Sequence, residues 1–498
     1  MGDVYTYADQ VVVWLGEAED GSDMALENMP SLAESFWAIK DHGWGFKTID
    51  EIVSLGLPHP SDPVWLATIL VFGRPWFQRL WIVQEIVLAR HSVFVCGERQ
   101  VEWAYVVNFA EAMAMSAFGA QIAGLYTRQM GPKQTEHCIN GLRLLRNTYK
   151  LRLAWEAENE KGLIRMVMQI MQSQSASEPV DYVYAVLGMI PEDISQSVSV
   201  DYSAENRLNY RKVHAHMFKL LLQRVSDWPS SLFPTDVERG GLPSWCPTWG
   251  SGFNTSFLPS TGTGAGRPAS EPARSSSKPF SVAVNEDPTV IDVAGAVVDT
   301  IKHIVRLEGW NGDNYGIAAG AGTMLESIKR CLYHVPVHSE NYRRLVGVFI
   351  GDHNWHQSSK FREYPNEDFL ADFLEYLERI AATKGRESEP IILDLDSSSE
   401  WLGENRFVRS YLNDLFFRWT GRCFAITSNG RIGLVPDQSK PGDPVCVFFG
   451  ARSPYIICRS ETGSHCKLRG PCFIDGIMDG ELFEDSRLEG EEEIFHIN

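Results

Sequence analysis

The chain has 498 residues, which is more than one hydrophobic core usually serves, so two or three domains are expected. With 44% hydrophobic and 22% charged residues, the composition excludes a wholly disordered chain, a collagen-like repeat and a small disulfide scaffold. The 64 acidic residues outnumber the 45 basic ones, and the resulting net charge of −19 argues against nucleic-acid binding.

The compartment is predicted from the chain start and from the cysteines. The opening residues, MGDVYTYADQ, do not combine a basic segment with an apolar one, so no signal peptide is expected. The nine cysteines include no CxxC pair, which favours free thiols in a reducing, cytoplasmic location. Residues 103–126 carry one charge, Glu111, but no second such stretch and no basic flank accompany them. They predict a buried helix and no membrane span.

Strands and helices alternate over the first hundred residues. The apolar run at residues 11–15 predicts a short strand that is buried on both faces. Helices are expected over residues 61–72 and from about 76 to 89, with a strand over residues 92–97. The spacing of Phe77, Leu80 and Trp81 predicts that they form one buried cluster with Trp14 from the first strand.

The rest of the chain changes from helical to β-rich. Residues 101–130 and 138–172 are expected to be helical, whereas residues 254–278 are rich in Ser, Thr, Gly, Pro and Ala and predict a disordered linker. Residues 281–307 alternate as strands do, and residues 366–384 predict a further helix. From Arg422 onward, short apolar runs alternate with turns, including the hairpin signal Asn429-Gly430. This pattern predicts a small antiparallel barrel or sandwich.

Common catalytic signatures are missing from the sequence. It contains no GxxxxGK[ST], HExxH, GxSxG or GxGxxG segment. Residues 262–266 resemble a phosphate loop, 311–316 a calcium loop and 353–356 a metal-binding histidine pair only in their letters. The first is not followed by a helix, the second has no acidic twelfth residue and the third has no further ligand. We therefore predict no catalytic residue, no metal and no cofactor.

The most informative segment runs from Arg79 to Glu85. It places Trp81, Gln84 and Glu85 at helical spacing, so the indole ring borders two polar side chains. Such a cluster either serves a site or forms a buried network that fixes the position of the helix, and the residues alone favour the second interpretation.

This segment resembles the end of the fungal heterokaryon-incompatibility (HET) domain, where the family pattern is R-x-W-x-x-Q-E. The upstream strand is similar to the family's Y-x-x-A-x-x-V-x-V-W-L-G pattern. Downstream, the chain resembles the D-x-V-Y-A-L-L-G, D-Y-S and L-P-S-W-x-P-D-W segments of full-length members. The residues that match, and that we expect to be mainly structural, are Trp14, Gly16, Arg79, Trp81, Gln84, Glu85, Asp181, Tyr184 and Gly188.

Two departures from the family pattern stand out. The Arg of the family's D-P-R-D segment is replaced by Val180, so a partner for carboxylates is missing there. The family's opening blocks, Y-x-A-L-S-Y-x-W-G and L-W-I-D-A-x-C-I-N-Q, are absent. The resemblance therefore implies a truncated HET domain, which leaves residues 11–15 without parallel neighbours and exposes a strand edge and an apolar face. Either another chain covers them, or the protein is marginally stable.

Together these features predict four regions. The first is a partial HET domain at residues 1–103, which the resemblance implies to be a truncated, doubly wound α/β domain similar to Toll-receptor-type (TIR) domains. A helical region at 104–253 and a disordered linker at 254–280 follow. The last is a mixed, β-rich region at 281–498.

The resemblance implies an interaction module of fungal self/non-self recognition and cell-death signalling, with a protein partner or self-association. Two alternatives remain open at this point. One is a TIR-like enzyme that cleaves NAD, should an N-terminal segment be missing, and the other is a non-functional remnant. Because the blocks that would build a nucleotide pocket are absent, we expect no NAD hydrolysis by the chain as it stands.

Overall fold

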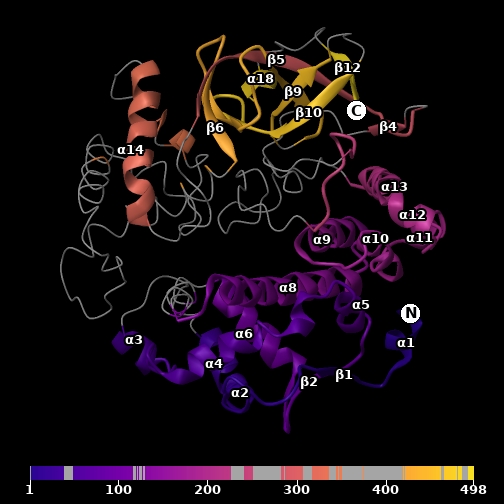
Figure 1. Cartoon of the computed structure of the whole chain (residues 1–498), viewed down its shortest axis with the longest axis vertical. Coiled ribbons are helices and arrows are strands. Elements are labelled where there is room, and N and C mark those ends of the chain that lie inside the picture. The colour runs from indigo at the N-terminus through magenta and orange to yellow at the C-terminus, as the bar shows by residue number, and fades with distance from the viewer. Residues whose placement is uncertain are drawn as a thin grey trace. The chain divides into compact units, whose positions relative to one another are not determined.

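A computed structural model describes the chain in segments. The described residues are 2–38, 49–115, 129–225, 241–250, 282–284, 287–306, 317–335, 421–451, 453–460, 465–478, 481–484 and 492–498, with scattered helical residues between 119 and 126 and between 344 and 419. The predicted linker at 254–278, the predicted helix at 366–384 and the segments at 311–316 and 353–356 lie outside the described residues or largely so. Figure 1 shows the elements in chain order.

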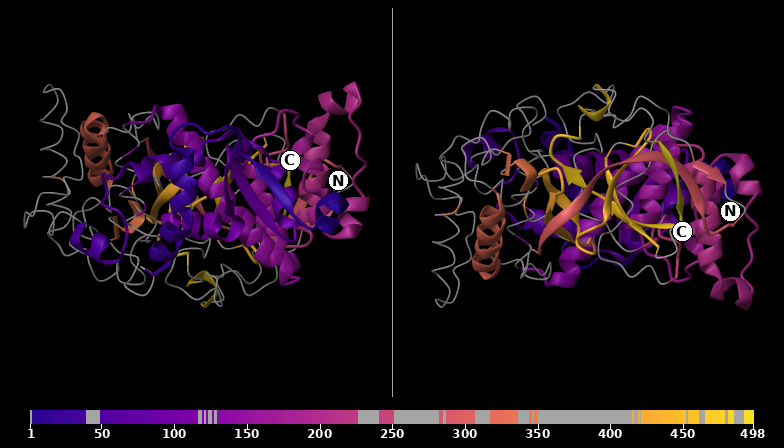
Figure 2. Two further views of the ribbon diagram at one scale, coloured as in Figure 1. Left: turned by 90° about the horizontal axis from the view of Figure 1, so that it is seen from below. Right: turned by 90° about the horizontal axis from the view of Figure 1, so that it is seen from above.

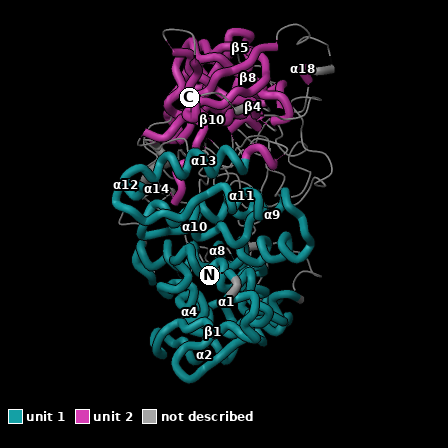
Figure 3. The backbone as a smooth tube through the Cα atoms, turned by 90° about the vertical axis from the view of Figure 1, so that its right-hand side faces the viewer, with its two compact units in different colours: residues 1–221, 392–397 teal, residues 222–391, 398–498 magenta. Residues whose placement is uncertain are grey.

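Two compact units make up the chain. The first contains Met1–Leu221 and the second begins at Leu222 (Figure 3). The first unit is α/β at its start and helical afterwards, whereas the second is mainly β. This order confirms the predicted sequence of an α/β part, a helical part and a β-rich part.

The first unit contains a three-stranded sheet. β1 (Val11–Trp14) pairs in parallel with β2 (Ser92–Cys96), and β2 pairs antiparallel with β3 (Arg99–Glu102). The expectation that β1 has no parallel neighbour is therefore wrong. The parallel partner comes from residues 92–96, which follow the helices of this unit in the sequence.

Helices cover one face of this sheet. α2 (Ser22–Ala38) and α6 (Trp103–Met115) contact β2 and β3, and α4 (Pro63–Val71) packs against α2. α4 confirms the predicted helix at 61–72, because Asp62 caps it by accepting the Val64 N–H at 2.9 Å and Pro63 occupies its first turn. The core beneath the sheet is aromatic, and Phe36, Trp65, Phe72, Phe77, Phe94 and Phe109 are all buried.

Two predictions about the first unit are wrong. β1 is buried on one face only, since the Val12 and Trp14 side chains are 60% and 51% exposed while Val13 is buried. Trp14 therefore does not join the cluster predicted with Phe77, Leu80 and Trp81.

The predicted helix at 76–89 is interrupted. It is split into the 3₁₀ helix η2 (Pro75–Gln78) and α5 (Ile82–Val87), because Arg79 has an extended backbone and bridges to Ser175. The Leu80 N–H donates to the Ser175 carbonyl at 3.2 Å, so a strand-like contact replaces a helical turn. Phe77 and Leu80 are buried as predicted, whereas Trp81 is half-buried.

The middle of the chain is helical. α8 (Pro132–Glu156) and α9 (Glu160–Ser173) replace the single helix expected over 138–172, and they separate where Glu158 adopts a positive φ of 50°. Asn159 caps α9 by accepting the Gly162 N–H. The remaining elements are α1 (Gly2–Tyr7), α3 (Ile49–Ser54), α10 (Asp181–Tyr184), η3 (Leu187–Met189), α11 (Glu192–Gln196), α12 (Ala204–Leu208) and α13 (Tyr210–Leu222).

The second unit contains a closed barrel. Its five strands pair in the ring order β5, β12, β10, β9, β8 and back to β5. Their bounds are β5 (Ile291–Arg306), β8 (Pro444–Phe448), β9 (Tyr455–Arg459), β10 (Cys466–Pro471) and β12 (Glu493–Ile497). This ring confirms the predicted small barrel, but it is not wholly antiparallel as expected, because β12 and β10 pair in parallel.

Strand β5 belongs to two sheets. Figure 2 shows it as a long strand that curves across the barrel. Its first half pairs with β8, β12 and the short β4 (Val282–Val284), and its second half pairs with β6 (Arg422–Thr427). β6 pairs with β7 (Ile432–Pro436), and β7 with β11 (Phe473–Ile474).

The β6–β7 hairpin turns at the predicted Asn429-Gly430, where Gly430 has a φ of 77°. Helix α14 (Ile317–His334) contributes to a core with β5, β6 and β7, and α18 (Glu481–Glu484) is a single turn. Among the described helices, none is long and apolar enough to cross a membrane.

Candidate functional site

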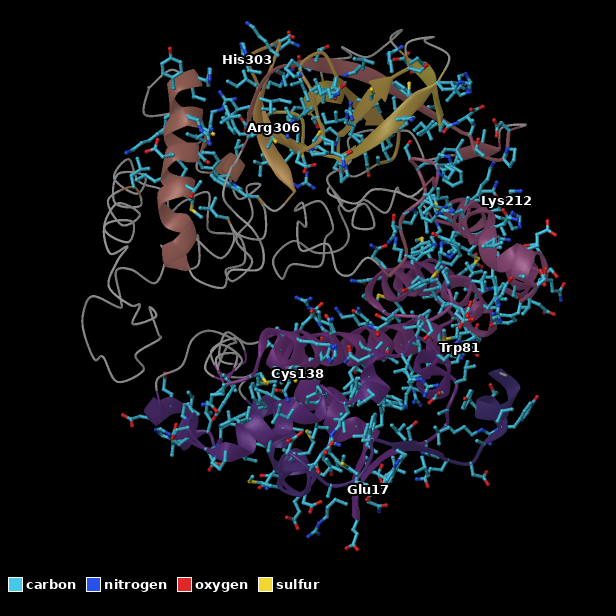
Figure 4. The ribbon with its side chains drawn as sticks, viewed as in Figure 1. Glu17, Trp81, Cys138, Lys212, His303 and Arg306 are labelled. Atoms are coloured by element: carbon cyan, nitrogen blue, oxygen red, sulfur yellow. The ribbon has the colours of Figure 1, made fainter. Side chains whose placement is uncertain are left out.

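Asp181 connects the motif at 79–85 to the helical part of the same unit. It lies in the first turn of α10, and its two carboxylate oxygens accept one hydrogen bond each. Trp81 Nε1 donates to Oδ2 at 3.1 Å, and the Tyr202 hydroxyl donates to Oδ1 at 2.6 Å. Trp81 is labelled in Figure 4, where it lies beside α5. One carboxylate therefore joins two side chains that lie 100 residues before it and 21 residues after it in the sequence.

Tyr184 fixes the other end of α10. Its hydroxyl lies 3.2 Å from both the carbonyl and the amide of Asp201, and Asn206 Nδ2 donates to it at 2.8 Å. The rings of Tyr184 and Tyr202 meet edge to face with centroids 5.3 Å apart. These contacts hold the segment 201–206 against α10.

Gln84 makes the third connection. Its side chain is buried on α5, and Nε2 donates to the Ala185 carbonyl at 2.6 Å. A Cβ added at Gly188 would lie 3.3 Å from Gln84 Oε1, so this glycine permits a close approach. We refer to Trp81, Gln84, Asp181, Tyr184, Ala185 and Tyr202 as the motif junction.

Glu85 and Arg79 lie at the edge of the motif junction. Trp76 Nε1 donates to Glu85 Oε2 at 3.4 Å, a long hydrogen bond. Burial raises the pKa of Tyr5 on α1; the negative charge of Glu85 raises this pKa further, whereas the positive charge of Arg79 lowers it. Both charges therefore act on the Tyr5 hydroxyl, and Arg79 itself is exposed.

Burial also controls the titratable groups around α10. It raises the pKa of Tyr202, and the hydrogen bond to Asp181 adds to the increase. It lowers the pKa of His214 on α13 to about 4, although the hydrogen bond between Nε2 and the Pro179 carbonyl (2.7 Å) opposes this change. Near neutral pH, His214 is therefore neutral and Tyr202 remains a hydrogen-bond donor.

Trp14 and Gly16 lie elsewhere. Gly16 follows β1 with a φ of 107°, and its carbonyl accepts the Gly97 N–H at 2.9 Å. Beside it, Arg74 pairs with Glu19 at 2.8 Å. No hydrogen bond or ring contact among the described residues joins Trp14 to the motif junction. Seven of the nine predicted residues are thus brought to the motif junction or its edge, and two mark the end of the sheet.

Several residues at this site were not selected from the sequence. Tyr202 belongs to the matched D-Y-S segment, which was the available signal for it. Asn206 had no signal, because its contact with Tyr184 depends on the turn at 201–206.

Metal and thiol chemistry find little support in the described part of the chain. It holds no group of three His, Cys, Asp or Glu side chains that could bind a metal ion. All nine cysteines are free, and burial raises the pKa of Cys138 to about 11 and those of Cys446, Cys466 and Cys472 as well. These thiols are therefore poor nucleophiles at neutral pH.

Comparison with known proteins gives matches at both ends of the chain. Residues 1–85 match the family "Heterokaryon incompatibility protein (HET)", and residues 326–496 match the "Het-6 beta-barrel domain". A curated relative, "Heterokaryon incompatibility protein 6, OR allele" of Neurospora crassa, is 23% identical over 561 aligned residues. The alignment covers 98% of this chain and 79% of the relative, whereas no solved structure matches.

Proposed function

Because this chain is a heterokaryon incompatibility (HET) domain protein with a Het-6 barrel, we propose that it acts in fungal self/non-self recognition and cell-death signalling. It does so as an interaction module that meets a protein partner or a second copy, in the cytoplasm and without binding nucleic acid. The similarity to an incompatibility protein over 98% of the chain supports this role. The net charge of −19 supports the exclusion of nucleic acid.

The observation that carries the proposal is the use of the motif side chains. Trp81 and Gln84 direct their polar atoms to Asp181 and to the Ala185 carbonyl, and Asp181 has both oxygens occupied. A catalytic group needs a polar atom that can reach a substrate. We therefore assign these residues to joining the HET motif to the helical part, so that a signal received by one part can reach the other.

The test is a fusion assay in a filamentous fungus. Strains that express the full chain are fused with strains that differ at incompatibility loci, and dying hyphal compartments are scored with a membrane-impermeant dye. We expect death in some pairings only, because recognition depends on the partner. Death in every pairing or in none would contradict the proposal.

Variants connect the assay to the structure. Asp181→Asn weakens the acceptor of two hydrogen bonds and should abolish cell death. Glu34→Gln removes a carboxylate from an exposed position of α2 and should leave it intact. The NAD content of the same hyphae distinguishes the interaction module from the enzymatic alternative. A fall in NAD content that precedes cell death and is abolished by Glu85→Gln would support NAD cleavage and overturn our assignment.

A further inference from the structure

β1 has one open edge. Its Val11 N–H donates to the His91 carbonyl at 2.9 Å and its Leu15 N–H to the Val95 carbonyl at 2.8 Å. In a parallel pair, alternate residues direct their backbone groups to the same neighbour. Val12 and Trp14 therefore direct their N–H and C=O groups away from β2. No strand among the described residues pairs with this edge.

The same two residues expose their side chains. Val12 and Trp14 lie on one face of β1 and are 60% and 51% exposed, whereas Val13 and Leu15 on the other face are buried. Across the sheet Trp14 is in register with Val95, which is only partly buried. Parallel strands are normally covered on both faces, so this strand presents an uncovered edge beside an apolar face.

The edge carries none of the usual protective features. Natural edge strands avoid unwanted pairing with a Lys, a Pro, a bulge or a very irregular backbone. The sequence of β1, Val-Val-Val-Trp, has no charge and no proline, and its register with β2 is regular over all four residues. β-branched and aromatic residues favour strand pairing. The edge is therefore well suited to accept another strand.

Charge at the ends of β1 specifies the kind of strand. Asp9 precedes β1, and Glu17 and Asp20 follow it; Glu98 lies in the turn between β2 and β3. No ion pair of Glu17, Asp20 or Glu98 occurs among the described residues. The nearby Arg74 and Arg99 are already paired with Glu19 and Glu27. The end of the edge that follows Trp14 is thus negatively charged, whereas at the other end Arg90 lies beside Asp9, because Val11 is bonded to His91 of the neighbouring strand.

A second copy of this strand is disfavoured by the same charges. Antiparallel pairing of two β1 strands brings Asp9 of one chain towards Glu17 of the other, and parallel pairing brings identical acids together. Like charges placed opposite each other destabilise strand pairs. The net charge of −19 adds a repulsion between whole chains.

We propose that β1 is a docking edge for an extended segment of another protein. The segment adds to β1 as a strand, covers Val12 and Trp14 with its apolar side chains and carries Lys or Arg at the end that meets Glu17 and Asp20. This inference deepens the interaction role proposed above and depends on it for its biological meaning. A binding assay in solution tests the docking edge, and the fusion assay tests the interaction role. Either assay can fail while the other succeeds, so failure of one proposal can be distinguished from failure of the other.

Hydrogen exchange resolved to single amides tests the open edge in the full chain alone. The Leu15 amide should be protected, because it is bonded to β2, while the Val12 and Trp14 amides should exchange rapidly. If the Val12 and Trp14 amides were protected from exchange, and more so at higher protein concentration, a second copy would be the occupant of the edge. Protection that is independent of concentration would identify a segment of the same chain. Either result overturns the proposal.

Two synthetic peptides test the chemistry of the partner. Each has six alternating valine and threonine residues, and carries either two lysines or two glutamates at each end. The lysine peptide should bind the full chain at least tenfold more tightly, and raising the salt concentration from about 0.05 M to about 0.5 M should reduce this difference. Equal binding of both peptides would overturn the proposal.

Matched variants locate the binding. Val12→Lys should weaken binding of the lysine peptide at least tenfold, because it adds a positive charge to the docking face. Val53→Lys makes the same change at a position of α3 with similar exposure (52%) and should alter binding by less than twofold. Equal thermal melts establish that both variants are folded. Equal effects of the two variants on binding would contradict a site at β1.

Discussion

Asp181 accepts hydrogen bonds from two side chains that are far apart in the sequence. Trp81→Phe keeps most of the ring and removes the N–H, so we expect a loss of about 2 kcal/mol in the free energy of unfolding, typical of a hydrogen bond to a charged group. Tyr202→Phe removes the other donor. Urea unfolding of the full chain measures both effects.

The two substitutions should not be additive. Because both donors share one carboxylate, each remaining bond should change in strength when the other is removed, giving a coupling of at least about 0.5 kcal/mol in a double-mutant cycle. Trp76→Phe removes a donor to a different carboxylate, Glu85, and combined with Tyr202→Phe it serves as the control pair. Coupling of the same size in both pairs would contradict the shared-acceptor interpretation.

His214 makes the stability of the first unit depend on pH. Its pKa is lowered to about 4 in the folded chain, mainly by burial, whereas an unfolded histidine titrates near 6.5. Protonation therefore favours the unfolded state. The stabilising contribution is complete above pH 6.5 and is lost as the pH falls from 6.5 through 4, by about 3 kcal/mol.

The change His214→Gln tests this prediction. The amide can still donate to the Pro179 carbonyl, but it does not titrate, so the variant should lose less stability than the wild type between pH 6.5 and 4. Urea unfolding at several pH values measures the difference. If the free energy of unfolding of His214→Gln depended on pH as that of the wild type does, the assignment of His214 as a buried, neutral histidine would be wrong.

Two glycines in the β6–β7 region allow the cost of backbone strain to be distinguished from the cost of a steric clash. Gly430 has a φ of 77° and open space around its Cβ position, so Gly430→Ala should cost about 1 kcal/mol through strain alone. Gly430→Asn should cost less, because Asn tolerates this conformation. A Cβ at Gly433 would lie 2.2 Å from the Phe473 carbonyl oxygen, so Gly433→Ala should cost about 3 kcal/mol.

Thermal melts of the three glycine variants measure these differences. The expected order of stability is Gly430→Asn, then Gly430→Ala, then Gly433→Ala. If Gly433→Ala were the mildest of the three, the pairing of β7 with β11 would have to differ from that described.

At the element scale, local signals predicted more than tertiary ones. The cap Asp62-Pro63 and the turn Asn429-Gly430 depend on neighbouring residues, and both elements formed where expected. The break at Arg79 depends on Ser175, almost a hundred residues away, and no periodicity reports such a contact. The exposure of Trp14 has a similar cause, because an apolar strand looks the same in sequence whether or not its second face is covered.

The candidate site shows the same limit. The motif residues were found through their resemblance to a family, but the sequence did not indicate that Trp81 and Gln84 contact Asp181 and Ala185. The expected neighbours of Trp81 were Gln84 and Glu85 on one helix face. In the structure α5 begins after Trp81, so its indole group turns towards α10 instead.

At the scale of the whole molecule, residues 241–250, which precede the predicted linker, are bonded to the barrel. Ser244 Oγ bonds with the Asn498 carbonyl and accepts the Leu468 N–H, and the buried Trp245 donates to the Thr289 carbonyl at 2.8 Å. We expect a promiscuous protease to cut first within residues 254–278, as their composition predicts. The two fragments should nevertheless elute together, because 241–250 still contacts the barrel.

Trp245→Ala should release the fragments after cleavage, since truncation of a buried tryptophan costs about 3–5 kcal/mol. Size-exclusion chromatography of the cleaved protein measures this. Trp37→Ala, a tryptophan truncation on the partly exposed α2 surface, is the control and should leave the fragments together. Fragments that separate without any substitution, or a first cut within 422–458, would contradict this prediction.

Barrel closure by β12 has a consequence for the synthesis of the chain. β12 lies between β5 and β10 in the ring, yet it is the last of the five strands to leave the ribosome. Domains generally fold as they emerge, in N-terminal order, so the first unit can form while translation continues. The barrel cannot: β5 and β10 must wait with open edges until residues 493–497 arrive. A frameshift or an early stop codon just before them would therefore leave an unclosed barrel, which chaperones and proteases of the cell can detect by its exposed strands.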